Sequence, residues 1–503
     1  MSYLLGIDAG TTTIKVALFD PQKGLLARAS VNCPAIYEKE RIAEIDMARY
    51  WNACCECIHQ IAESHKSRFN DIRALCISSQ GVTFVPLDRS GRELRRGIIY
   101  YDTRAKSEAE TLVHRFGDQK LYEITGQPGI SALYEAAKLL WIRKNEPDCF
   151  RDIHKILLVH DYLVFKFTGT FACVPPILSS SLLFDVLHRK WWEEMFSFLG
   201  ITEMKFPKIY KPGTPVGPVK KDVALDSGLP ESALVVAGAI DQICGMLGVG
   251  NIHAGLVSES TGSVLAVHTV TQSMFEHRKA GIHNFCNAID STYALISVCP
   301  TAGAALNWFK DAFCEHEEKE AEMVHRNVFQ ILDEEAEKEA IGSDGLIMLP
   351  HLIGGGSPKP NPHAKGVFYG FRLHHKKGHF IRAILESVAF MLRSNLEVLH
   401  QAGINIEEIR SFGGGSHSRL WNQIKADVCG LPVVASHSDE PGCLGAAILA
   451  GVGSGIFQSI EEGCETLVLP GKPHYPKESN VRMYESYFQE YMRLNVILEP
   501  MFS

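Results

Sequence analysis

Asp8 lies at the end of an apolar run near the start of the chain, and Gly10, Thr11 and Thr12 follow closely. A tight turn of glycine and small polar residues can present backbone N–H groups and hydroxyls to phosphate oxygens. A carboxylate at the end of a strand can hold Mg²⁺ or its bound waters. The apolar residues on both sides of the turn predict two paired strands, and the alternative is an ordinary hairpin in a solvated sheet.

A second stretch, residues 255–268, has the same plan about 250 residues later. An apolar run leads into a turn made of Ser260, Thr261, Gly262 and Ser263, and another apolar run follows. Two similar hairpins at this spacing predict two lobes that each offer a phosphate-holding turn to a shared cleft. This arrangement resembles the actin-like, ribonuclease-H-like ATPase superfamily.

Asp241 is the residue best placed for catalysis. It follows an apolar strand predicted at residues 234–240, and Gln242 comes next, shortly before the second hairpin. Phosphoryl transfer to an alcohol needs a group that accepts the hydroxyl proton and a metal that neutralises phosphate charge. Asp241 as the base and Asp8 near Mg²⁺ can divide these tasks. The structural alternative for Asp241 is a helix N-cap, a position that aspartate often occupies.

Residues 413–416, Gly-Gly-Gly-Ser, lie between a predicted strand and a predicted helix. Glycines at this point let a ligand lie against the backbone, and the N-terminus of a helix favours an anion. The alternative is a plain connecting loop. The sequence lacks a P-loop, a G-x-G-x-x-G after the first strand and the protein-kinase motifs, which excludes those three kinds of phosphate site.

Polar residues follow two further predicted strands. Gln80 comes just after a short strand at residues 74–78, and strand ends of this kind face the ligand crevice in α/β sheets. Asp102 and Arg104 follow a strand near residue 98, where the alternative to a binding role is a structural ion pair.

Several helices are predicted from apolar residues at helical spacing. Asp46 is predicted to cap the first helix, a long amphipathic helix is expected at residues 379–402, and a helix of small residues is expected at residues 440–452. Residues 21–45 are polar, and we expect them to be irregular.

The composition limits the class of protein. The chain has 503 residues, enough for two or three domains, and its net charge of −8 argues against a nucleic-acid partner. No apolar run is as long as a membrane span, and Asp8 interrupts the only apolar run near the start, so neither a membrane partner nor a signal peptide is expected. The chain has fourteen cysteines and no predicted export signal, so we expect it in the cytoplasm with its cysteines as free thiols.

Four stretches together resemble the FGGY family of carbohydrate kinases, in order and at family spacing. They are residues 6–12 (Gly-Ile-Asp-Ala-Gly-Thr-Thr), 237–242 (Ala-Gly-Ala-Ile-Asp-Gln), 260–263 (Ser-Thr-Gly-Ser) and 412–416 (Phe-Gly-Gly-Gly-Ser). Residues 366–371 and 379–386 resemble the C-terminal signature of the family, with Phe371 in place of the usual aliphatic residue. The resemblance implies an α/β fold with two actin-like (ribonuclease-H-like) lobes and a nucleotide and sugar cleft between them. We place the lobes at residues 1–250 and 251–503.

The resemblance also implies an ATP- and Mg²⁺-dependent kinase that phosphorylates a hydroxyl of a small ketose or polyol. It makes Asp241 the catalytic base and Asp8 the residue that positions Mg²⁺. The implied substrate contacts are Gln80, Asp102, Arg104, Asp241 and Gln242. The implied nucleotide contacts are Gly10, Thr11, Thr12, Thr261, Gly262, Gly414, Gly415, Ser416, Arg419 and Asn422.

The sugar pocket departs from the better-known relatives. Glycerol kinases carry an Arg-Glu pair after the glutamine that aligns with Gln80, and xylulokinases carry Met-His, whereas this chain has Gly81-Val82. Tyr100 replaces the tryptophan of the usual Trp-x-Asp-x-Arg. Because a site reads hydroxyls through matched polar groups, glycerol is disfavoured. A pentulose such as xylulose is the expected substrate, and Gly81-Val82 leaves another ketose or polyol open.

The alternative from another class is a non-catalytic actin-like nucleotide-binding sensor or scaffold, which would not need Asp241. As a kinase, the protein is expected to bind ATP and a small sugar or polyol and to form a homodimer.

Overall fold

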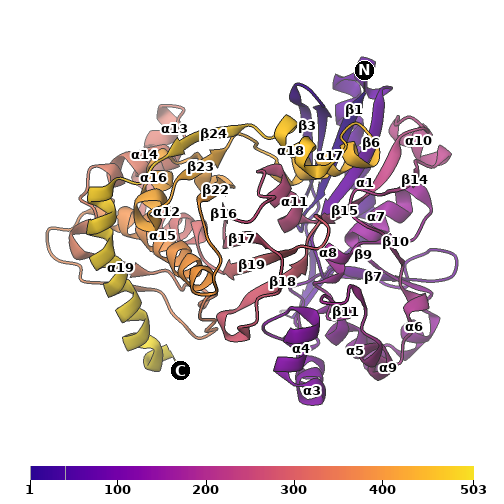
Figure 1. Cartoon of the computed structure of the whole chain (residues 1–503), viewed down its shortest axis with the longest axis horizontal. Coiled ribbons are helices and arrows are strands. Elements are labelled where there is room, and N and C mark those ends of the chain that lie inside the picture. Colours follow the sequence, from indigo (N-terminus) through magenta and orange to yellow (C-terminus); the bar gives the residue numbers. More distant parts are fainter. Residues whose placement is uncertain (1, 40, 503) are drawn as a thin grey trace.

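Two large β-sheets, one from each half of the chain, form the framework of the protein (Figure 1). The computed structural model describes residues 2–39 and 41–502. The first sheet has the strand order β14 (Pro215–Pro218), β15 (Leu234–Ile240), β6 (Ile72–Ser79), β1 (Tyr3–Ala9), β2 (Thr13–Asp20) and β3 (Gly24–Asn32). The second has the order β18 (Ile282–Cys286), β19 (Tyr293–Cys299), β17 (Leu265–Thr271), β16 (Leu256–Thr261), β22 (Glu408–Phe412), β23 (Val433–Ser436) and β24 (Pro470–His474).

The two large sheets share one plan. In the first, β1, β2 and β3 pair antiparallel, and β6 and β15 then add parallel to β1. In the second, β16, β17 and β19 pair antiparallel, and β22 and β23 then add parallel to β16. Both predicted hairpins are therefore present, and each opens its sheet in the same way.

A third sheet of five strands lies in the first half, with the order β4 (Ile36–Lys39), β5 (Ile42–Ile45), β8 (Gly97–Ile98), β7 (Phe84–Leu87) and β9 (Lys155–Leu158). Short strand pairs complete the β-structure: β10 (Ala172–Cys173) with β13 (Lys208–Ile209), β11 (Phe184–Asp185) with β12 (Lys190–Trp191), and β20 (Ile347–Leu349) with β21 (Val367–Tyr369).

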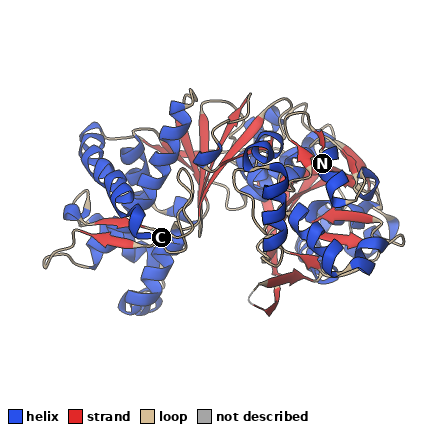
Figure 2. Ribbon diagram, turned by 90° about the horizontal axis from the view of Figure 1, so that it is seen from below, coloured by secondary structure: helices blue, strands red, loops and turns tan. Residues whose placement is uncertain are grey.

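Helices cover the sheets in both halves (Figure 2). Those of the first half are α1 (Met47–Ser64), α2 (Lys66–Phe69), α3 (Lys106–Phe116), α4 (Asp118–Thr125), α5 (Glu135–Asn145), α6 (Pro147–Asp152), α7 (Val159–Thr168), α8 (Pro175–Leu178), α9 (Glu193–Leu199), α10 (Lys221–Ser227) and α11 (Asp241–Gly248). Those of the second half are α12 (Gly303–Phe313), α13 (Glu315–Met323), α14 (Val328–Glu337), α15 (Lys377–Gln401), α16 (Arg419–Cys429), α17 (Pro441–Gly453), α18 (Ile460–Leu467) and α19 (Glu478–Leu498). In the part of the chain that the structure describes, none of these helices combines the length and apolarity that a membrane span requires.

Alternation along β1 gives the first sheet two separate cores. Leu5 and Ile7 are buried in one core with α1, whereas Leu4 is buried in another with α17. Successive side chains of a strand point to opposite faces, so a sheet that is covered on both faces needs apolar residues at every position. As predicted, Asp46 caps α1, because its Oδ1 accepts hydrogen bonds from the backbone N–H groups of Ala48 and Arg49.

Helix α17 comes from the second half of the chain but packs against the first sheet. In Figure 1 its yellow ribbon lies beside the indigo strands of the first half. A Cβ added at Gly6 of β1 would lie 1.9 Å from the carbonyl oxygen of Cys443, and one at Gly445 would lie 1.9 Å from that of Cys244 in α11. Only glycine permits these close approaches. The contacts fix the start of α11 and the start of α17 next to the end of β1.

The prediction that residues 21–45 are irregular is wrong for the described part of that range. Strands β3, β4 and β5 lie there, and residue 40 is outside the described residues. Among the described residues, β3 forms the outer edge of the first sheet and pairs with β2 alone. An edge strand needs little apolar surface. The pattern that predicts a strand is therefore weak in β3, whose sequence is Gly-Leu-Leu-Ala-Arg-Ala-Ser-Val-Asn.

Candidate active site

Five of the predicted site residues, Asp8, Asp241, Gln242, Gly414 and Ser416, line one cavity at the strand ends of the two large sheets. The cavity has a volume of about 340 Å³. Asp8 and Asp241 line it from the first half of the chain, and Gly414 and Ser416 line it from the second. The cavity therefore joins the first hairpin, the start of α11 and the glycine-rich loop.

Asp8 is held near the end of β1 by its neighbours on both sides. In the sheet register it lies opposite Lys15 on β2 and Ser78 on β6. The Ser78 hydroxyl donates a hydrogen bond of 2.8 Å to Asp8 Oδ1. Burial raises the pKa of Asp8, while the Ser78 hydrogen bond and the charge of Lys15 oppose that rise. A Cβ added at Gly442 would lie 2.8 Å from Asp8 Oδ2, so the missing side chain leaves room beside the carboxylate.

Asp241 is the first residue of α11 and follows β15 directly. It is not the N-cap, which is Ile240, so the structural alternative considered for this aspartate does not apply. The backbone N–H of Gln242 donates a hydrogen bond of 2.7 Å to Asp241 Oδ1. Burial, with a further contribution from the charge of Asp8, raises the pKa of Asp241 to about 7. A carboxyl that titrates near neutral pH is suited to accept a proton from a hydroxyl group.

This pKa predicts the acid limb of the pH profile. We expect kcat/KM for the sugar to fall about tenfold per pH unit below about pH 7, because protonated Asp241 cannot act as a base. Above that pH, Asp241 should impose no further change. A coupled assay of ADP release from roughly pH 5 to 9, at saturating MgATP, measures the profile. A profile that stays flat between pH 7 and pH 5, as a carboxyl with an ordinary pKa near 4 would give, would contradict the assignment.

Lys15 and Glu440 form an ion pair in the cavity wall that the sequence did not reveal. Lys15 Nζ donates to Glu440 Oε2 at 2.7 Å, across a separation of 425 residues. Burial opposes the charge on Lys15, but the carboxylates of Glu440 and Asp8 together raise its pKa. The sequence held a signal for Lys15 but none for Glu440: a hairpin that pairs Asp8 with Lys15 places both side chains on one face of the sheet.

The glycine-rich loop packs directly on the second hairpin. A Cβ added at Gly415 would lie 2.6 Å from Thr261 Cγ2, so only glycine fits there. The amide of Asn422 donates to the Ser416 carbonyl oxygen at 2.7 Å and so braces the loop from α16. Arg419 instead points to Glu337 in an exposed ion pair and does not line the cavity.

Polar groups of the second hairpin turn form hydrogen bonds to other groups of the protein. Thr261 Oγ1 donates to Glu259 Oε2 at 2.6 Å and accepts from Lys425 Nζ at 3.0 Å. The backbone N–H of Gly262 donates to the carbonyl of Val264 at 3.1 Å. These contacts shape the turn. The role of Thr261 and Gly262 in holding phosphate stays a prediction.

Gln80 ties the first hairpin turn to the loop after β6. Its Oε1 accepts from Thr83 Oγ1 at 2.8 Å and from Thr11 Oγ1 at 3.4 Å. Its Nε2 donates to the carbonyl of Gly10 at 3.4 Å. Thr12 is exposed at the tip of the turn. Gln80 thus positions the turn, and its predicted contact with the substrate is not supported by these hydrogen bonds.

Asp102 and Arg104 form a buried ion pair outside the cavity. Asp102 accepts from the backbone N–H of Ala43 at 2.7 Å, and the Arg104 guanidinium donates to Asp102 and to Glu44, each at 2.8 Å. The guanidinium also lies over the Trp141 ring, 5.0 Å from its centre. These contacts match the structural alternative considered for the pair, and the predicted binding role has no support from them.

The cavity fits a magnesium–nucleotide complex. Asp8 supplies a carboxylate of the kind that Mg²⁺ prefers, and Mg²⁺ is commonly held by one or two carboxylates together with substrate phosphates. A larger protein cage is not needed, and residues 2–39 and 41–502 contain no cluster of three or more His, Cys, Asp or Glu suited to a metal. A Cβ at Gly414 would meet no atom within 4 Å, which leaves open space on the second-half side of the cavity.

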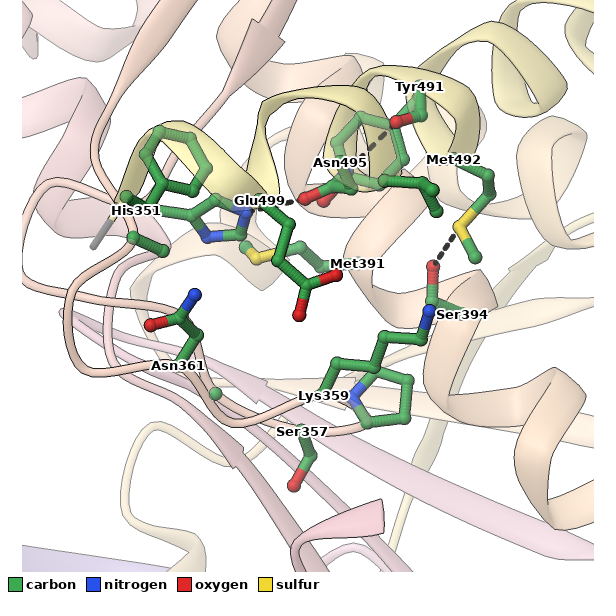
Figure 3. A pocket seen from close by; sticks show the side chains of 16 residues that line it. His351, Ser357, Lys359, Asn361, Met391, Ser394, Tyr491, Met492, Asn495 and Glu499 are labelled. Atoms are coloured by element: carbon green, nitrogen blue, oxygen red, sulfur yellow. Dashed lines mark hydrogen bonds between the residues drawn. The ribbon is translucent and has the colours of Figure 1, made fainter. Parts of the chain in front are cut away.

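A separate pocket of about 100 Å³ lies between α15, α19 and the loop after β20 (Figure 3). In its wall, His351 Nε2 lies 2.8 Å from Asn495 Oδ1. None of the predicted site residues lines this pocket.

Comparisons with known proteins identify the family of the chain. The N-terminal domain of the FGGY family of carbohydrate kinases matches residues 3–248, and its C-terminal domain matches residues 260–454. The xylulose kinase of Bacillus subtilis (strain 168) is 28% identical over 494 residues, which cover 98% of this chain and 97% of that protein.

Solved structures show the same fold. A xyloylose kinase from Brucella ovis has a TM-score of 0.89 at 26% identity, covering 99% of this chain and 100% of that one. A gluconate kinase from Lactobacillus acidophilus has a TM-score of 0.90 at 24% identity, covering 99% and 98%. The predicted α/β fold with two actin-like lobes is confirmed. The chain belongs to the FGGY family of carbohydrate kinases.

Proposed function

We propose that this sugar kinase phosphorylates a hydroxyl of a pentulose such as xylulose, with Asp241 as the general base and Asp8 as the residue that positions Mg²⁺. One observation carries the catalytic part: Asp241 lies in the cavity beside Asp8 with a pKa of about 7. The substrate is inferred from relatives named xylulose kinase that match nearly the whole chain. The family uses ATP with Mg²⁺, so the phosphoryl donor is MgATP.

The residues of the chain divide the work of the transfer. The Asp241 carboxylate accepts the proton of the substrate hydroxyl. The hydroxyl oxygen of the substrate then bonds to the γ-phosphorus of ATP, and the bond from that phosphorus to ADP breaks. Gln242, which lines the cavity next to Asp241, orients the sugar. Lys15 lines the cavity with a raised pKa and remains a cation near the phosphates. When bound, Mg²⁺ neutralises phosphate charge and is held at Asp8.

Closure of the lobes completes the site in this proposal. Water that reached the γ-phosphate would accept it in place of the sugar, so the cleft must exclude water during transfer. We place the boundary between the lobes near residue 250, where α11 ends and β16 begins. The close contact of α11 with α17 makes this helix pair the expected joint.

A substrate panel tests the proposal. We expect sugar-dependent ADP release with xylulose to exceed that with glycerol by a factor of about 10² or more, since Gly81-Val82 lacks the polar side chains that read glycerol hydroxyls. A coupled assay over ketopentoses, deoxyketoses, tetritols and pentitols measures the ratio. Efficient turnover of glycerol would contradict the reading of Gly81-Val82, and turnover of a different ketose would replace the substrate while keeping the mechanism.

The setting of the enzyme is also a proposal. We place it in the cytoplasm as a homodimer, without nucleic-acid or membrane partners. All fourteen cysteines are free thiols, which suits a reducing compartment, and the net charge of −8 does not favour nucleic acid. Light scattering in solution tests the dimer.

A further inference from the structure

His268 is a buried histidine with no part in the mechanism above. It lies on β17, and its Nε2 is 2.7 Å from Gln242 Oε1, the shortest hydrogen bond that its ring makes. On the other side of the ring, Nδ1 lies 3.4 Å from the Ser258 hydroxyl and 3.2 Å from the Ser258 carbonyl. His268 is fully buried, whereas Gln242 lines the cavity. The ring therefore stands directly behind a residue of the proposed sugar site.

The imidazole carries a single N–H group at neutral pH. Burial lowers the pKa of His268 to about 4, so the ring is neutral and one nitrogen donates while the other accepts. Two acceptors compete for the single ring proton: the Ser258 carbonyl, 3.2 Å from Nδ1, and the Gln242 oxygen, 2.7 Å from Nε2. We assign the proton to the shorter contact. The Asn251 amide donates to Ser258 Oγ at 2.9 Å, so the Ser258 hydroxyl proton is free to donate to Nδ1. The ring proton is therefore on Nε2, which donates to the Gln242 amide oxygen at 2.7 Å.

This tautomer decides which end of the Gln242 amide faces the cavity. If the amide oxygen accepts from His268, the amide NH₂ group is turned toward the substrate as a hydrogen-bond donor. A free glutamine could rotate and present either end. Fixing the donor end favours a substrate that offers an oxygen acceptor beside the reacting hydroxyl, and it lowers the entropy lost on binding.

We propose that His268, held by Ser258 and Asn251, is a positioning residue that orients the Gln242 amide as a donor toward the sugar. The inference rests on the proposed function, because it assumes that Gln242 contacts the sugar. It predicts an effect on sugar binding that is separate from ATP binding, because His268 acts through its hydrogen bond to Gln242, the proposed sugar contact.

Substitution of His268 tests the role. In His268→Leu, we expect the KM for xylulose to rise about tenfold while the KM for ATP stays within twofold, since the loss of one well-placed hydrogen bond has that size. His268→Gln, whose side-chain NH₂ can replace the Nε2 donor, should recover most of the loss. The double variant His268→Leu/Gln242→Ala should be no worse than Gln242→Ala alone, because His268 acts through Gln242.

His351→Leu is the matched control. His351 makes the same kind of bond, from Nε2 to an amide oxygen, and its pKa is also lowered by burial, but it lies in the separate pocket of Figure 3. We expect it to leave the KM for xylulose unchanged. A tenfold rise there would mean that loss of the half-buried histidine in the separate pocket has the same effect. Additive losses in the double variant would show that His268 does not act through Gln242. Either result overturns the inference.

A measurement on the wild-type protein separates this inference from the proposed function. The ¹⁵N NMR shifts of His268 report which ring nitrogen carries the proton, with no need for activity or for a variant that folds. We expect the Nε2–H tautomer, and an Nδ1–H tautomer would overturn the orientation of Gln242. Absence of sugar-dependent ADP release in the wild type would instead contradict the proposed function.

Discussion

Replacing Asp241 with asparagine is expected to lower kcat for sugar phosphorylation by a factor of about 10² to 10⁴, the usual contribution of a general base. Asparagine has the same shape, and its amide oxygen can still accept the hydrogen bond from the Gln242 backbone. It cannot take up the hydroxyl proton. Because the nucleotide contacts are unchanged, ATP affinity measured by calorimetry should remain close to that of the wild type, while coupled ADP release measures the loss in kcat.

The same substitution should stabilise the protein above pH 7. Asp241 has an ordinary pKa of 3.8 in the unfolded chain and a pKa of about 7 in the folded protein. Between these values the unfolded chain releases the proton that the folded protein keeps, so the ionised carboxylate costs stability as pH rises, and the full cost is present above pH 7. Asp241→Asn should therefore melt at a higher temperature than the wild type at pH 8, with a smaller difference near pH 4.

Three outcomes would contradict this account of Asp241. Turnover close to that of the wild type would show that another group accepts the proton. A large loss of ATP affinity would show that Asp241 acts on the nucleotide. A variant that loses activity and also loses stability at pH 8 would point to a structural role, because removal of an unfavourable buried charge should have the opposite effect on stability.

Features with local signals could be predicted from the sequence. The two hairpins could be predicted because each joins two apolar runs through a turn of glycine and small polar residues. The Asp46 cap could be predicted because it comes directly before the apolar repeat of helix α1. Asp241 was found for a similar reason: a carboxylate that follows a buried strand at a sheet end is unusual and points to a ligand crevice.

Features that depend on distant contacts could not be predicted. The position of α17 on the first sheet and the Lys15–Glu440 pair join residues more than 400 positions apart, and no local pattern carries that information. The same limit applies to the polar groups of the sugar site. Gln80 follows a predicted strand end, but in the fold its amide also hydrogen-bonds to Thr83 and to the Gly10 carbonyl, and no local pattern reveals these contacts.

The second large effect is expected at Lys425, which lies behind the second hairpin. Its Nζ donates to Glu259 Oε1 at 2.6 Å, and both side chains are fully buried. The Ser411 hydroxyl also donates to Glu259. Lys425→Met would keep the side-chain volume but leave a buried carboxylate without its cation. We expect a loss of about 3–5 kcal/mol in the free energy of unfolding, measured by denaturant titration.

A surface pair provides the matched control, and the comparison separates burial from distance. Lys319 and Glu315 also lie 2.6 Å apart, but their side chains are 67% and 82% exposed, so Lys319→Met should cost at most about 0.5 kcal/mol. Adding Glu259→Gln to Lys425→Met should recover much of the loss, because it removes the unpaired charge. Equal effects of the two lysine substitutions would mean that the buried pair does not stabilise the fold.

Since Lys425 also donates to Thr261, and Thr261 packs on Gly415, a destabilised pair should in addition raise the KM for ATP.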